Sequence, residues 1–285
     1  MPTVAGTGWS RREHVLPCKE VSTVTRNVRW AAACVALLAA AAMPGCSTAS
    51  DDYQSTTAAT STAEPTQTFA SRLAATDAPL DIYLVGDGTG ASLGGWVYLT
   101  IQSLAQTSGR PADIREWDVL AGEGYIEPAI HVADGTGQPI TLWNASVSRN
   151  IDFINDVLPQ MRPPAGIDLV LVNNGLDIGP TMLAQESIPL MRVLRDQNPG
   201  ASVVSILQPA PSQPEAQSDQ QRANTRDLEI SSRKNEFQTI DVATALSEAP
   251  DVYDGVDRYA NTEGQRIWAS VVADSLTSDI TVPSQ

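Results

Sequence analysis

The sequence predicts an α/β protein: a three-layer α/β/α sandwich around a mostly parallel sheet of five strands. Five short apolar segments, rich in β-branched residues, have the length of buried parallel strands. Helical segments fall between most of them, and this alternation is typical of a parallel sheet with helices on both faces. The strand segments are residues 80–85, 139–143, 167–172, 201–207 and 237–242.

Helices are expected at residues 90–105, 150–161, 189–197 and 218–234. The last helix has the clearest signal, because the run from Thr262 to Gln265 has capping-box spacing and the apolar residues that follow share one helical face. An insertion at 125–138, with a turn at 134–137, interrupts the alternation.

The first 46 residues have the pattern of an export signal. Arg26 and Arg29 precede a 12-residue apolar run at 31–42, which suits a signal peptide and is shorter than the roughly 20 residues that span a bilayer. The run leads to Gly45-Cys46, as in a lipobox, where Cys46 would be lipidated. Ordinary signal cleavage near Gly45 is the alternative. The stretch 1–20 is consistent with a misassigned start site.

The region after the signal divides into two parts. Residues 47–79 are rich in Ser, Thr and Ala and lack an apolar period, so we expect a disordered tether there and a folded domain over 80–285. With 18 Lys and Arg against 33 Asp and Glu, the chain has a net charge of −15. Such a surface repels phosphate backbones and anionic lipids. Nucleic acid is therefore excluded as a partner, and membrane attachment must come from the lipid anchor.

Four short motifs lie after predicted strands or before the last helix, where the loops of an open parallel sheet bind ligands. They read VGDGT at 85–89, NASVSR at 144–149, NGLD at 174–177 and DGVDRYAN at 254–261. In this order they resemble the motifs of the SGNH (GDSL-type) hydrolases, which carry Gly-Asp-Ser, Asn-Ala-Ser-x-Ser-Gly, Gly-x-Asn-Asp and Asp-x-x-His-Pro-Asn. The resemblance covers residues 80–277.

The positions that perform catalysis in that family carry other residues here. Gly88 occupies the place of the nucleophilic serine, and Arg149 that of the oxyanion glycine. Leu176 replaces the oxyanion asparagine and Asp257 the catalytic histidine, whereas Asp254 matches the family aspartate. The resemblance thus implies a domain without catalytic residues. Its expected binding cleft consists of Asp87, Gly88, Thr89, Arg149, Asn174, Leu176, Asp254 and Asp257.

Arg149 and Asp257 are expected to face each other in that cleft. An ion pair between them would replace the catalytic triad, because a buried charge without a partner is costly. The competing expectation is an Arg149 side chain that points to solvent.

Three alternative functions follow from the same loops. An atypical esterase or carbohydrate O-deacetylase would use a hydroxyl of Thr89, Ser92, Ser146 or Ser148, with His131 as the one histidine left after the signal. A metal or glycan site would use Asp87, Asp177, Asp254 and Asp257. A dinucleotide site would use GDGTGA at 86–91, although Asp87 would repel a pyrophosphate.

The sequence favours an inactive, lipid-anchored domain on the outer face of the cell membrane. It would bind an envelope glycan, lipid or protein, with neither a cofactor nor a metal.

Overall fold

The computed structural model describes residues 67–164, 166–176, 182–210, 215–249, 251–253, 259–278 and 281–282. The expected signal peptide, Cys46, Asp177, Asp254 and Asp257 lie outside these residues. Within the described ranges, no helix is long and apolar enough to cross a bilayer.

A seven-stranded sheet with the order β4-β3-β5-β2-β6-β7-β8 forms the centre of the fold. All neighbouring strands are parallel except β4, which runs antiparallel to β3. The strands are β2 (Leu80–Gly86), β3 (Ala112–Glu116), β4 (Ile130–Ala133), β5 (Ile140–Ser146), β6 (Leu169–Asn173), β7 (Ser202–Leu207) and β8 (Gln238–Asp241). A separate antiparallel pair joins β1 (Gln67–Thr68) to β9 (Thr281–Val282).

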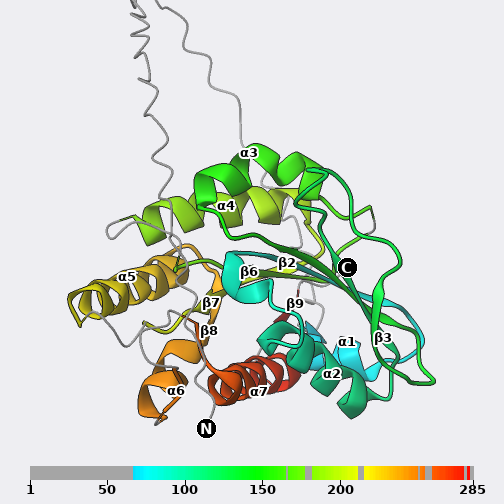
Figure 1. Ribbon diagram of the computed structural model, residues 1–285. Coiled ribbons are helices and arrows are strands. Elements are labelled where there is room, and N and C mark those ends of the chain that lie inside the picture. The colour runs from blue at the N-terminus through cyan, green and yellow to red at the C-terminus, as the bar shows by residue number, and fades with distance from the viewer. Residues whose placement is uncertain are drawn as a thin grey trace, which may run out of the picture. The chain divides into compact units, whose positions relative to one another are not determined.

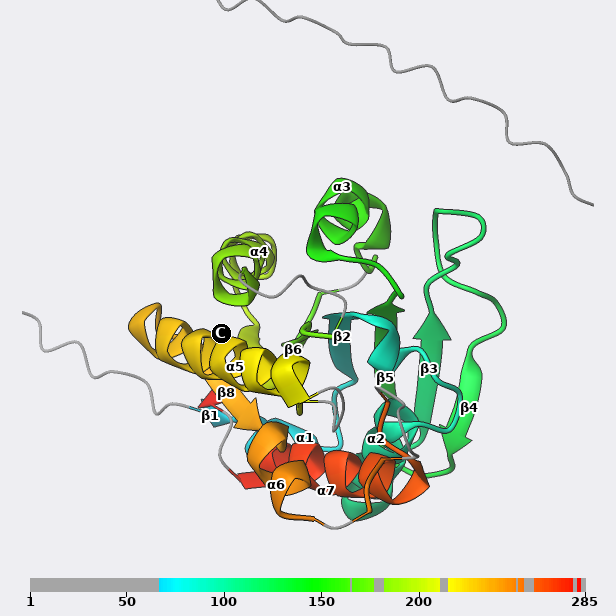
Figure 2. The ribbon, with the colours of Figure 1, turned by 60° about the vertical axis from the view of Figure 1, so that its left-hand side comes forward.

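Helices cover both faces of the sheet, as Figures 1 and 2 show. One face carries α3 (Ile151–Met161), α4 (Leu183–Gln197) and α5 (Glu215–Lys234). The other carries α1 (Phe69–Ala74), α2 (Trp96–Ser108), α6 (Val242–Glu248) and α7 (Thr262–Ser278). Each face has its own hydrophobic cluster, so the predicted three-layer α/β sandwich is confirmed.

The central strands are buried because both of their faces meet helices. Every residue of β6 is buried, and so is every residue of β2 except Asp81. Such strands form near-continuous apolar runs in the sequence, which is why the prediction located them well. The stacked rings of Trp96 and Trp268, with centroids 5.2 Å apart, join α2 to α7.

The strand number and the start of one helix differ from the prediction. The sheet has seven strands, because β3 has the charged sequence ADIRE and β4 lies inside the insertion at 125–138. The helix expected from residue 90 begins at Trp96. It is preceded by the 3-10 turn η1 (Gly88–Gly90) and by Gly94, whose φ of +71° breaks a right-handed helix. Ser92 therefore lies in a turn.

The fold also includes residues 67–79, which the sequence assigned to the tether. Phe69 and Leu73 of α1 are buried in the core, at 0% and 3% exposure. The guanidinium of the fully buried Arg110 donates hydrogen bonds to the backbone carbonyls of Arg72, Leu73, Ala75, Ala78 and Gln138. Arg110 thereby fixes the segment after α1 to the start of β5.

The expected capping box of α7 is also different. Asn261, and not Thr262, caps the helix: its Oδ1 accepts hydrogen bonds from the N–H groups of Glu263 and Gly264, at 3.1 and 3.0 Å. Gln265 instead accepts a 2.7 Å bond from the N–H of Trp96. It therefore satisfies the first turn of α2, which has no cap of its own.

Candidate functional site

The turn after β2 is held by the buried carboxylate of Asp87. Its Oδ1 accepts hydrogen bonds from the N–H and hydroxyl of Thr89, at 3.1 and 2.7 Å. Its Oδ2 accepts bonds from the N–H groups of Gly175 and Leu176, both 3.0 Å, and from Gln208 Nε2 at 2.9 Å. Burial raises the pKa of Asp87, while the bonds from Thr89, Leu176 and Gln208 lower it. Asp87 is thus a brace between loops.

Polar side chains from β6 and β7 extend this brace. Asn173 Nδ2 donates a 2.7 Å hydrogen bond to Thr89 Oγ1, and Gln208 Nε2 lies 3.2 Å from the same oxygen. The carboxyl ends of β2, β6 and β7 are therefore linked through buried groups. Gln208 was missed by the sequence analysis, because an isolated Gln after a strand carries no recognisable signal.

Gly88 lies directly against Ser148, from the loop that follows β5. A Cβ added to Gly88 would lie 2.3 Å from Ser148 Oγ and 3.2 Å from the hydroxyl of Tyr259. The Ser148 hydroxyl thus lies where a Cβ at residue 88 would be, and the exposed Ser148 side chain would have to rotate to admit one. Gly90 has a similar contact, because a Cβ there would lie 2.2 Å from Ser146 Oγ.

A carboxylate and an amide support the same region from the edge of the sheet. Asn144 Nδ2 donates hydrogen bonds to the carbonyl of Gly90 at 3.0 Å and to Glu116 Oε1 at 3.1 Å, and the Tyr98 hydroxyl donates to the same Oε1 at 2.7 Å. Burial raises the pKa of Glu116, and the hydrogen bonds that it accepts from Tyr98 and Asn144 lower it. Glu116 therefore anchors Asn144, which positions the turn at Gly90.

The other predicted cleft residues have different environments. Arg149 is exposed; its Nη1 donates to the carbonyl of Ser148 at 2.9 Å, and its guanidinium lies 5.9 Å from the ring centre of Phe153. Asn174 is buried, and its Nδ2 has no partner among the described residues. Leu176 contributes its backbone N–H to Asp87. Because Asp257 lies outside the described residues, its ion pair with Arg149 stays a prediction.

His131 is remote from Gly88. It is exposed on β4, where Nδ1 lies 2.8 Å from Asp113 Oδ1 and Nε2 lies 3.1 Å from Asp134 Oδ1. Three strand spacings separate β4 from β2, or roughly 14 Å at about 4.8 Å each. The strand register aligns His131, through Asp113, with Asp81 near the start of β2. Gly88 follows the other end of β2, and the length of the strand from Asp81 to Gly86 adds about 17 Å to the separation. His131 therefore cannot act as a base at Gly88.

The described residues contain no group of three or more His, Cys, Asp or Glu side chains that could hold a metal ion. Of the four aspartates considered for a metal site, Asp87 is described, and its two oxygens are occupied by five protein donors.

Solved structures share the architecture of this chain. A carbohydrate esterase family 3 protein from Talaromyces cellulolyticus is 14% identical, with 69% of this chain and 96% of that chain covered and a TM-score of 0.51. An alpha/beta hydrolase enzyme from the metagenome of Lake Arreo, Spain, is 11% identical, with coverages of 70% and 96% and a TM-score of 0.51. A lipolytic protein of the G-D-S-L family from Veillonella parvula is 14% identical, with coverages of 70% and 100% and a TM-score of 0.49.

This chain shares its three-layer α/β fold with these hydrolase and esterase structures. No family model matches the sequence, and no curated protein matches it. At these identities the likeness lies in the fold.

In this α/β domain, the matching motif residues that the structure describes have structural roles. Asp87 joins the loops after β2 and β6, and Asn144 holds the Gly90 turn and accepts a 3.1 Å hydrogen bond from the N–H of Ser146. Gly88 and Leu176, which depart from the motifs, stand where the resemblance places the nucleophile and an oxyanion donor. The motif residues that this chain keeps, Asp87 and Asn144, are thus ones that hold the loops in place.

Proposed function

We propose that this chain is an exported, lipid-anchored protein whose SGNH-like domain binds a ligand at the cell envelope without hydrolysing it. The observation that carries the proposal is the contact between Gly88 and Ser148. Gly88 has no nucleophile, and the Ser148 hydroxyl fills the space that a serine side chain at residue 88 would enter.

Two further observations support a non-hydrolytic role. A serine is a poor nucleophile without a positioned base. His131 lies on β4, three strand spacings from β2, and is level with the start of β2, whereas Gly88 follows its end. Leu176 offers no side-chain donor, so it cannot stabilise an oxyanion as an asparagine does.

A hydrolysis assay tests this proposal. The purified protein should cleave short-chain nitrophenyl esters and acetylated sugars no faster than buffer. Gly88→Ser combined with Ser148→Gly, which frees the space at residue 88, should also restore little, because catalytic groups act as a unit. Turnover by the native protein well above the buffer rate would contradict the proposal.

One observation favours the alternative of an atypical ester hydrolase. Ser148 Oγ and the Tyr259 hydroxyl both approach the point where the Cβ of a residue 88 side chain would lie, so Ser148 could substitute for the missing nucleophile. The two functions differ in one variant: Ser148→Ala should abolish turnover if Ser148 is the nucleophile. If the domain is inactive, the native protein and Ser148→Ala should both give the buffer rate.

The lipid anchor has a separate test. Cys46→Ser should move the protein from the membrane fraction to the soluble fraction, because a lipidated cysteine would be the attachment point of an acidic chain. Unchanged membrane retention of the variant would contradict the anchor.

A further inference from the structure

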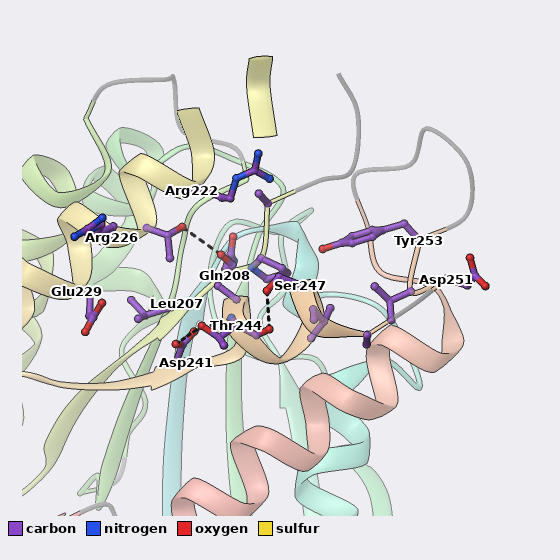
Figure 3. Close-up of a pocket in the computed structure, with 17 residues that line it drawn as sticks. Leu207, Gln208, Arg222, Arg226, Glu229, Asp241, Thr244, Ser247, Asp251 and Tyr253 are labelled. Carbon is purple, nitrogen blue, oxygen red and sulfur yellow. Dashed lines mark hydrogen bonds between the residues drawn. The ribbon is translucent and has the colours of Figure 1, made fainter. Parts of the chain in front are cut away.

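A groove of about 680 Å3, lined by both polar and apolar side chains, lies between α5 and α6, beside the carboxyl ends of β7 and β8. Its volume is within the range of about 300 to 1,000 Å3 that is usual for ligand pockets. Gly88, Ser148 and Leu176 are not among the described residues that line this α5–α6 groove, whereas Gln208, which donates to Asp87 and Thr89, does line it. The groove therefore adjoins the Gly88 site without including Gly88. Its lining includes Arg222, Thr225, Arg226, Thr244, Ser247 and Tyr253, several of which Figure 3 labels.

One wall of the groove carries two arginines. Arg222 and Arg226 are four residues apart on α5 and so share a helical face, and Figure 3 places both on the α5 side. Arg222 pairs with Asp219 at the surface, whereas Arg226 has no hydrogen-bond or ion-pair partner in the described part of the chain. An unpaired guanidinium presents planar donors that match a carboxylate or a phosphate. These two guanidiniums favour an anionic group at this wall, although the net charge of −15 on the whole chain opposes one.

The acidic side chains that also line the groove leave this preference intact. Asp241 accepts hydrogen bonds from the N–H and hydroxyl of Thr244, at 2.9 and 2.7 Å, and so caps α6. Glu229 pairs with Arg233 at 2.8 Å. Asp251 points away from the centre of the groove in Figure 3. Glu229 therefore has a counter-ion of its own, and Asp241 remains charged with both oxygens hydrogen-bonded.

Hydroxyl groups supply the other half of the groove's chemistry. The hydroxyls of Thr225 and Ser247 donate to the backbone carbonyls of Gln208 and Thr244, at 3.2 and 2.8 Å. With these protons in use, the two oxygens keep lone pairs that can accept hydrogen bonds.

Tyr253 supplies a hydroxyl from the other side of the groove. That hydroxyl is buried without a partner among the described residues and is directed into the groove in Figure 3. Burial raises the pKa of Tyr253 to about 12, so the group is a donor at neutral pH. Because a buried hydroxyl without a partner is costly, a ligand that pairs with it gains affinity.

We propose that the α5–α6 groove binds an acidic sugar, with the sugar carboxylate on Arg226 and Arg222 and the sugar hydroxyls on Ser247 and Tyr253. An anionic group beside several hydroxyls is the ligand chemistry that matches guanidinium donors beside acceptor oxygens. This inference rests on the proposed binding function and gives it a ligand class and a location in the α5–α6 groove, beside the Gly88 site.

Calorimetric titration of the purified full-length protein tests the assignment, with D-glucuronate, D-glucose and acetate as probes. Glucuronate should bind saturably, and glucose and acetate at least about tenfold more weakly, because each lacks one half of the chemistry. Arg226→Ala should weaken glucuronate binding about tenfold or more, and Tyr253→Phe about three- to tenfold. Arg266→Ala serves as the matched control, because Arg266 is exposed on α7 and pairs with Glu263; it should bind like the native protein.

The outcomes separate this inference from the proposed function. Absence of glucuronate binding, equal binding of glucose or acetate, or unchanged binding by Arg226→Ala would each overturn the groove assignment, whatever the ester assay gives. Ester hydrolysis that Ser148→Ala abolishes would overturn the non-hydrolytic role, and the effect of Arg226→Ala on glucuronate would still decide the groove.

Discussion

Asp87→Asn should strongly destabilise the domain, because the carboxylate accepts donors on both of its oxygens. In asparagine, one oxygen becomes an NH2 group that must face donors in a site where Asp87 is 2% exposed. Even in the better orientation, the variant loses the two hydrogen bonds that Thr89 donates. At about 1.5 to 3 kcal/mol for each hydrogen bond to a charged group, the expected loss is about 3 to 6 kcal/mol.

Thermal unfolding monitored by circular dichroism measures this loss. Each kcal/mol shifts Tm by roughly 2 to 4 °C in a domain of this size, so Asp87→Asn should lower Tm by roughly 6 to 24 °C. The control is Asp118→Asn, since the exposed Asp118 Oδ1 accepts from the N–H groups of Leu120 and Ala121 and asparagine retains that oxygen; the change should be within about 0.5 kcal/mol. A Tm for Asp87→Asn within about 2 °C of the native value would refute the bracing role.

Three further predictions concern other buried or paired groups. Arg110→Ala leaves five buried backbone carbonyls without their donor and should reduce the free energy of unfolding by about 3 to 5 kcal/mol in urea denaturation; a loss below about 1 kcal/mol would contradict its anchoring role. Gly90→Ala should destabilise by about 1 to 3 kcal/mol, because the new Cβ would lie 2.2 Å from Ser146 Oγ, and the double variant with Ser146→Gly should recover part of that loss. Hydrogen bonds to Asp113 and Asp134 raise the pKa of His131 above its ordinary value of 6.5. The stabilising contribution of His131 is therefore present below pH 6.5 and is lost as the pH rises through the raised pKa. An NMR titration should show a lower His131 pKa in Asp113→Asn than in the native protein, and an unchanged pKa would refute the pairing.

The predictable parts of this fold are those encoded by local apolar pattern. The buried strands β2, β6 and β7 form near-continuous apolar runs, and the helix expected at 150–161 is α3 (Ile151–Met161), with Asn150 as its N-cap. The edge strand β4 lacks that pattern, because one side of an edge strand faces solvent and tolerates charge. Its neighbour β3 was missed because three of its five residues are charged and only two are buried. The start of α2 was missed because its first N–H is satisfied by Gln265, which is 169 residues away.

The candidate site divides in the same way. The sequence by itself determined that residue 88 has no nucleophile and that Leu176 has no polar side chain, because these are matters of residue identity. Only the tertiary structure decided that Ser148 fills the space at Gly88, that Asp87 braces three loops, and that Arg226 and Tyr253 line one groove. Such contacts join segments that are tens of residues apart, and no local pattern records which loops the sheet brings together.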